Sequence, residues 1–295
     1  MELEPDGQCG DDAYYSIFED GTLYIFGEGD MWDFFFYYSV NTPWEAERSS
    51  IKCIVIEEDI TSIGSYSFYG CYNFTNIKIP DTVTTIGDAA FYECNSLRSI
   101  LIPDSVITID SYTFYRCYSL TSVTISNSVT AISNGTFCEC TNLQNVIIPD
   151  SVTAIGDYAF HHCKSLSRVI IPENVVSLGN YAFHGCRSFR SIKIPNSVTE
   201  LGQFAFGSCI NLKSVTIGNS VTTIGGSAFS NCYSLTRVEI PNSVIVICDG
   251  AFTCCNNLQK VTIPRSVTTI GDYAFYSCEN LRNLIIPDRI TNIGE

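Results

Sequence analysis

Residues 143–165 read LQNVIIPDSVTAIGDYAFHHCKS, and the pattern of this 23-residue stretch occurs ten times along the chain. Its Phe returns every 23 residues without an insertion, at positions 68, 91, 114, 137, 160, 183, 206, 229, 252 and 275. A Cys follows each of these Phe residues after three positions, from Cys71 to Cys278. Ten copies in one register predict a repeat protein in which each copy is one structural unit stacked on the next.

Each copy divides into two extended segments and a turn. The run LxxVxI followed by Pro, as in Leu235 to Pro241, is typical of a short strand that ends at the proline, because proline cannot donate to a ladder. The next segment, D/N-S-V-T-x-I-G, reverses the chain and forms a second short extended piece. An Asp or Asn then precedes the Phe (Asp88, Asp157, Asn180, Asp272) and is predicted to cap about one turn of helix. One copy cannot bury its own apolar side chains, so stacking is expected to join them into continuous ladders.

The LxxVxI strand and the segment S-V-T-x-I-G-x-x-A-F-x-x-C-x-x-L resemble the BspA-type leucine-rich repeats, over about residues 51–295. That family occurs in bacterial surface and secreted proteins and in some protist parasites. The resemblance implies an α/β fold, a right-handed leucine-rich-repeat solenoid with a concave parallel sheet and short helical turns on the other side. It also implies a role in adhesion, often as one part of a longer chain.

The charge and the apolar content exclude some classes of protein and place the acidity in one part of the chain. Apolar residues make up 45% of the chain, which excludes disorder. The formal net charge is −15, but residues 1–59 carry −13 of it, so the acidity belongs to the N-terminal segment. No apolar run is long enough for a membrane span. The first residues, MELEPDGQCGDD, lack the basic and apolar regions of a secretory signal, which leaves a cytosolic protein or an extracellular one whose signal was removed; we favour the second.

The sequence predicts four parts. Residues 1–8 are a linker or tag remnant, residues 9–59 an N-terminal cap, residues 60–290 the ten repeats, and residues 291–295 the start of a truncated eleventh. Within the cap, Ser16 to Phe26 is expected to form a β-hairpin with its turn at Glu19-Asp20-Gly21. A short helix is expected from Pro43, and Ile51 to Ile56 is expected to be strand zero of the sheet. We expect further domains beyond residue 295.

The stretch Met31 to Tyr38, MWDFFFYY, is the unusual part of the cap. We favour burial against the first repeat, and exposure would instead make it a partner site.

The fifteen cysteines and three histidines are the residues with the most reactive chemistry. Ten cysteines belong to the repeat and are interpreted as small buried hydrophobes, while Cys9 and Cys53 in the cap are a possible disulfide pair. His161 and His184 hold equivalent positions in adjacent copies, but the pattern offers them no third ligand. The sequence therefore predicts no metal site, no cofactor and no catalytic residue.

The basic residues follow the strands. Nine of the sixteen occupy the variable positions of LxxVxI, and only one acidic residue, Glu239, does. The nine are Lys78, Arg98, Arg168, Arg190, Lys193, Lys213, Arg237, Lys260 and Arg282. They predict a positive track on the concave face of the C-terminal half. The competing interpretation is local neutralisation by acids in the turns after the strands, such as Asp150, Glu173 and Asp288.

These observations favour a non-catalytic binding or adhesion module at the cell surface or outside the cell. Its expected partner is a host or neighbouring-cell protein, or an anionic polysaccharide, bound at the nine basic residues. The alternative is a substrate-targeting or spacer segment of a longer secreted enzyme or cell-wall protein. Nucleic acid is not expected as a partner, because the track lacks interleaved exposed aromatic residues.

Overall fold

The computed structural model describes residues 4–35, 41–282 and 284–295. The chain forms two compact units, Met1–Ser151 and Val152–Glu295. Both are built from strands and turns, and no α-helix occurs among the described residues. Those residues accordingly contain no helix with the length and hydropathy to cross a membrane.

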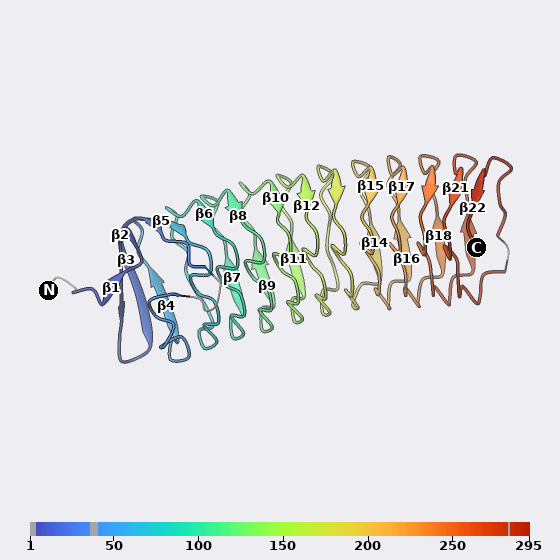
Figure 1. Cartoon of the computed structure of the whole chain (residues 1–295). Helices are drawn as coiled ribbons and strands as arrows, with labels where there is room; N and C mark the ends of the chain where they lie inside the picture. The colour runs from blue at the N-terminus through green and yellow to red at the C-terminus, as the bar shows by residue number, and fades with distance from the viewer. Residues whose placement is uncertain (1–3, 36–40, 283) are drawn as a thin grey trace. The chain divides into compact units, whose positions relative to one another are not determined.

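The first unit joins a β-hairpin to parallel repeats. Its strands are β1 (Gly7–Gln8), β2 (Gly10–Ile17), β3 (Thr22–Met31), β4 (Cys53–Ile56), β5 (Ile60–Ile63), β6 (Thr85–Ile86), β7 (Ser99–Leu101), β8 (Thr108–Ile109), β9 (Ser122–Thr124), β10 (Ala131–Ile132) and β11 (Asn145–Ile147). β3 pairs antiparallel with β2 and parallel with both β4 and β5. β5, β6 and β8 then continue one parallel sheet, and β7, β9 and β11 form another (Figure 1).

The second unit contains repeats throughout. Its strands are β12 (Ala154–Ile155), β13 (Ser177–Leu178), β14 (Ser191–Lys193), β15 (Glu200–Leu201), β16 (Ser214–Thr216), β17 (Thr223–Ile224), β18 (Arg237–Glu239), β19 (Val246–Ile247), β20 (Lys260–Thr262), β21 (Thr269–Ile270) and β22 (Asn292–Ile293). The LxxVxI segments give the parallel sheet β14-β16-β18-β20. The V-T-x-I segments give a second parallel sheet that includes β12, β13, β15, β17, β19, β21 and β22. The two extended segments predicted for each repeat are therefore confirmed in the repeats that contain β14, β16, β18 and β20.

The repeated Phe forms the centre of each unit. Phe160 and Phe183 stack with their ring centroids 5.1 Å apart, and the successive rings from Phe183 to Phe275 follow at 5.4–5.6 Å. This spacing is close to the separation of about 4.8 Å between neighbouring strands, so each ring packs on its equivalent in the next repeat. A constant period of 23 residues is what keeps these rings in line.

The predicted helical turns are wrong, because residues on either side of the Phe have a left-handed backbone. Tyr158 has φ 58° and His162 has φ 57°, which interrupts any helical run. The N–H groups of Tyr158, Phe160 and His162 donate to carbonyls of the next repeat at 2.7–2.8 Å. The amides between them, such as that of His161, bond three residues back. Alternate amides thus hold repeats together, an arrangement that a helix does not allow.

The Asp and Asn residues expected to be helix caps bond to the following repeat instead. Oδ1 of Asp157 accepts a hydrogen bond from the backbone N–H of Asn180 at 2.6 Å. Oδ1 of Asn180 accepts in turn from the N–H of Gln203 at 2.8 Å. The side chain satisfies a backbone donor, as predicted, but across the repeat boundary and not within one turn.

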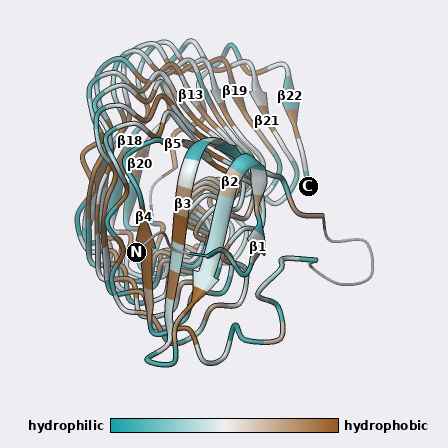
Figure 2. Cartoon of the chain, turned by 90° about the vertical axis from the view of Figure 1, so that its left-hand side faces the viewer, coloured by the Kyte–Doolittle hydropathy of each residue, from teal (hydrophilic) through white to brown (hydrophobic). Residues whose placement is uncertain are grey.

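The N-terminal segment completes the first unit. The hairpin predicted over Ser16 to Phe26 is present as β2 and β3, with Gly21 at φ 88° in its turn. Figure 2 shows β2, β3 and β4 side by side, with β4 coloured hydrophobic. The helix predicted from Pro43 is absent, and residues 43–50 form turns that bury Trp44 against Phe68 at 6.1 Å. Trp44 lies before the first repeat and begins the stack of rings. The repeat pattern does not include this position, so it gives no sign of that role.

The aromatic stretch that begins at Met31 divides between core and surface. Met31 and Phe34 are buried, whereas Trp32 is 42% and Phe35 is 70% exposed. Residues 36–38 lie outside the described part of the chain. The predicted burial is therefore confirmed for Met31 and Phe34 and wrong for Trp32 and Phe35, while a partner site at the exposed pair stays a prediction.

The repeat cysteines are buried hydrogen-bond donors. The Sγ–H of Cys209 donates to the carbonyl of Phe183 at 3.3 Å, and the same bond recurs from Cys186, Cys232 and Cys255. Burial raises the pKa of the Cys209 thiol to about 12, so the proton that makes this bond is retained at neutral pH. In the cap, Cys9 is buried and Cys53 exposed, and both are free, so the possible disulfide is not formed.

Removal of one ring from the stack is expected to be costly. Phe206→Ala leaves a cavity between Phe183 and Phe229 and should lower the free energy of unfolding by about 3–5 kcal/mol. Urea unfolding followed by circular dichroism measures this. Tyr233→Ala in the same unit, at a side chain 45% exposed, is the control and should change it by less than about 0.5 kcal/mol. Equal losses in both variants would contradict the stacked core.

The thiols should differ sharply in reactivity. Iodoacetamide added to the native protein is expected to modify Cys53 and to leave Cys186, Cys209 and Cys232 intact, because buried thiols of raised pKa offer no thiolate. Peptide mass spectrometry reads the modified positions, with a urea-unfolded sample as the control in which every thiol reacts. Native labelling of Cys209 as fast as Cys53 would refute the assignment.

Candidate functional site

The exposed side of the sheet β14-β16-β18-β20 presents the variable residues of the second unit. Inward side chains alternate with outward ones, so Ile192 is buried between the exposed Ser191 and Lys193. The strands align in register, with Ser191 beside Ser214, Ser214 beside Arg237, and Arg237 beside Lys260. We call this outward side the strand face; it consists of the exposed residues of the LxxVxI segments between Arg168 and Arg282.

Seven of the nine predicted basic residues lie on the strand face, all of them exposed, and Lys78 and Arg98 belong to the first unit. The sheet β14-β16-β18-β20 does not include all seven of them. Four strands form it, and by the usual strand spacing they span about 14 Å. Arg168 makes an isolated bridge before the sheet, and Arg282 follows it in a segment whose described residues form no strand.

Four basic residues stand at the beginning of these four strands: Arg190 and Lys213 directly precede β14 and β16, and Arg237 and Lys260 are the first residues of β18 and β20. Arg190 and Lys213 hold equivalent places in adjacent repeats, where the N–H of Lys213 donates to the carbonyl of Arg190 at 2.8 Å. Arg237 and Lys260 are direct neighbours in the register. We call Arg190, Lys213, Arg237 and Lys260 the basic stripe. Like charges this close repel one another, so the stripe favours an anionic ligand.

Ion pairs neutralise part of the track. Lys193 pairs with Glu173 at 2.5 Å, Arg237 pairs with Glu239, and Lys78 pairs with Glu58 at 2.7 Å in the first unit. The ammonium of Lys193 lowers the pKa of the Glu173 carboxyl. Turn acids therefore neutralise Lys193, through the expected Glu173, and Lys78, whereas the partner of Arg237 lies in β18 itself. All three pairs are solvent-exposed, so each adds little to stability.

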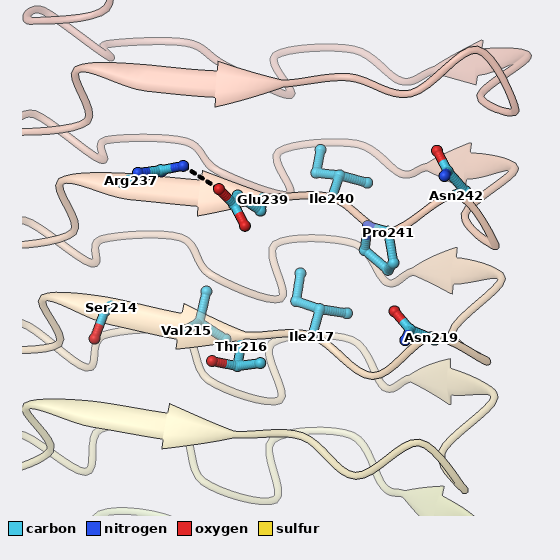
Figure 3. Close-up of a pocket in the computed structure, with 10 residues that line it drawn as sticks. All are labelled: Ser214, Val215, Thr216, Ile217, Asn219, Arg237, Glu239, Ile240, Pro241 and Asn242. Carbon is cyan, nitrogen blue, oxygen red and sulfur yellow. Dashed lines mark hydrogen bonds and ion pairs between the residues drawn. The ribbon is translucent and has the colours of Figure 1, made fainter.

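A shallow polar hollow of about 540 Å³ lies beside the stripe. Ser214, Thr216 and Asn219 line one side, and Arg237, Glu239 and Asn242 line the other (Figure 3). The hollow adjoins Gly218, which stands where the flanking repeats have Pro195 and Pro241. It therefore offers hydroxyl, amide and charged groups together on an otherwise regular sheet.

Apolar side chains flank the basic ones. Ile170 and Ile285 are each 79% exposed, at the variable position before the last Ile of the LxxVxI run. Ile285 borders a second hollow together with Gln259, Lys260 and Thr262. The strand face thus combines positive charge with exposed aliphatic carbon.

The three histidines form a cluster that the sequence interpretation missed. His161 and His184 stack at 5.3 Å, as their equivalent positions imply, and His162 also lies 5.6 Å from His184. His162 belongs to the cluster because its left-handed backbone turns its side chain toward those of its neighbours. Burial, and the adjacent His162, lower the pKa of His184 to about 4, so its ring is neutral at physiological pH.

Comparison with known families gives one match. The model of the BspA-type leucine-rich repeat region, in six copies, matches residues 47–167 and 176–295, which is most of the chain. Among curated proteins, none matches significantly.

Several solved structures are similar over nearly the whole chain. A leucine-rich repeat protein from Eubacterium ventriosum is 26% identical with a TM-score of 0.60, over 97% of this chain and 92% of that one. A leucine-rich cell surface protein from Faecalibacterium prausnitzii is 26% identical with a TM-score of 0.50, over 99% and 96%. A leucine-rich repeat protein from Bacteroides ovatus, 24% identical with a TM-score of 0.52 over 92% of each chain, shares the fold.

Proposed function

Because the chain belongs to the BspA-type leucine-rich repeat family, we propose that it is a non-catalytic binding module whose strand face in the second unit binds an acidic protein surface. The observation that carries this proposal is the segregation of charge. On a chain of net charge −15, the strand face has seven basic residues, and in the described part of the chain two of them form ion pairs, Lys193 with Glu173 and Arg237 with Glu239. An acidic partner gains both attraction and a faster encounter from such a surface.

A protein partner is favoured over an anionic polysaccharide by the apolar residues. The exposed side chains of Ile170 and Ile285 gain free energy when their aliphatic area leaves water, which requires another apolar surface. The hollow beside Arg237 adds neutral hydrogen-bonding groups that suit peptide and side-chain amides. Display at the cell surface or outside the cell is part of the proposal, and the similarity to the F. prausnitzii cell surface protein supports it.

Charge reversal within the stripe tests the site. Arg190→Glu with Lys213→Glu should weaken binding to immobilised poly-L-glutamate by at least about tenfold, which corresponds to about 1.4 kcal/mol. The matched control is Lys164→Glu with Arg187→Glu, an exposed pair in equivalent turn positions outside the strand face, which should bind as the parent does. Biolayer interferometry at two salt concentrations measures both, since screening weakens an interaction between exposed charges.

Heparin and alginate serve as the other ligands in that experiment. Stronger binding to either polysaccharide than to poly-L-glutamate would overturn the choice of a protein partner. Equal loss in the stripe and turn variants would overturn the site itself.

Charge reversal should weaken the binding of poly-L-glutamate, whereas release of Arg237 from its intramolecular partner should strengthen it. Glu239→Gln removes the acid that pairs with Arg237 on the face and should strengthen poly-L-glutamate binding by about two- to fivefold, a gain of about 0.4–1 kcal/mol. The control is Glu200→Gln, an equal change of charge at an exposed residue in β15 of the other sheet. Unchanged or weaker binding for Glu239→Gln would argue against a stripe that recognises anions.

A further inference from the structure

The histidine cluster shares no residue with the strand face and consists of imidazole rings. His161 and His162 are adjacent in one repeat, and His184 comes from the next. One nitrogen from each of the three rings lies within 4.8 Å of the other two, and all three side chains are partly exposed. These are all the histidines of the chain, so their convergence at one place calls for an explanation.

Two glycines leave space for these imidazole rings, because a Cβ at either position would lie too close to a ring atom. A Cβ at Gly185 would lie 2.9 Å from Cδ2 of His162, and a Cβ at Gly207 would lie 2.8 Å from Nδ1 of His184. Gly185 has φ 73°, but the equivalent residues Ser208 and Asn231 adopt the same left-handed backbone without being glycine. The requirement for glycine at position 185 therefore comes from the imidazole ring beside it and not from the backbone alone.

The aromatic neighbours hold the cluster in place. Tyr158 and Tyr181 stack at 4.9 Å, and each also makes an edge contact of 5.5 Å, Tyr158 with His161 and Tyr181 with His184. Nδ1 of His184 is buried and makes no hydrogen bond within the described part of the chain. A buried, unsatisfied ring nitrogen costs free energy unless it gains a partner.

We propose that His161, His162 and His184 form a binding site for a divalent transition-metal ion such as Zn²⁺. In a tetrahedral site with Zn–N bonds of about 2.0–2.1 Å the nitrogens stand about 3.4 Å apart, so ring rotations that shorten the present spacing by up to about 1.4 Å complete the geometry. Three imidazole nitrogens suit zinc, nickel or copper and not magnesium or calcium, which prefer oxygen ligands. A three-histidine set also leaves a coordination position for water or an incoming ligand.

The test uses the full chain with ¹⁵N-labelled histidine. Zn²⁺ is titrated while the imidazole nitrogen signals are followed by NMR, and one equivalent should shift the signals of all three histidines together. Mg²⁺ is the control ion and should shift none of them. Cys53→Ser removes the exposed thiol and should leave the zinc-dependent shifts unchanged.

Variants are taken from the same positions in other repeats, where the fold accepts them. His162→Ser copies Ser208 and Ser277, and His184→Tyr copies Tyr276. Loss of a residue that only supports a metal ligand typically costs 10- to 100-fold in affinity, so loss of a ligand itself should weaken Zn²⁺ binding by at least about tenfold. The urea midpoint without metal should stay close to that of the parent.

Three results would overturn the proposal. They are the absence of any zinc-dependent shift, a shift confined to one histidine, or undiminished zinc affinity in both variants. None of these results bears on the strand face, because the cluster and the basic stripe share no residue.

Discussion

The structure depends on main-chain hydrogen bonds that pass from each repeat to the next through the segment around the Phe. The N–H groups of Phe183, Phe206 and Phe229 donate to the carbonyls of Ala205, Ala228 and Ala251, each at 2.8 Å. Together with the two strand ladders they tie each repeat to its neighbour at three places. A backbone that bonds only to adjacent copies requires equal copy lengths, which explains why the 23-residue period carries no insertion.

Since the backbone and the inward side chains hold the repeats together, the outward positions can vary in sequence. Phe, Cys, Leu, Val and Ile fill the interior in every copy, and the residues between them on the first strands face solvent and take no part in the core. The basic stripe, the hollow beside Gly218 and the histidine cluster all arise at such variable positions. Both proposed sites therefore lie at positions that the repeat pattern leaves variable, where equivalent residues of neighbouring repeats are aligned.

Much of the architecture followed from periodicity alone. The two extended segments, the buried ladders and the exposure of the nine basic residues were predictable, because alternation and spacing report directly which side chains face inward. The hairpin before the repeats was predictable from its Asp20-Gly21 turn. The conformation around the Phe, which was predicted as helical, was not, since Tyr158, His162 and Asn231 adopt a positive φ that residues other than glycine rarely show. Sequence pattern gives no sign of that conformation, and the place of His162 beside His184 depends on it. The pairing of Arg237 with Glu239 was also hidden, because it depends on rotamers and not on spacing.

Amide hydrogen exchange of the second unit tests the dependence on repeat-to-repeat bonds most directly. The account predicts that the amides of Phe183, Phe206 and Phe229 exchange as slowly as the strand amide of Val215, because all of them are buried and hydrogen-bonded to a neighbouring repeat. Exchange of the three Phe amides at the rate of exposed turn amides, with Val215 still protected, would contradict it.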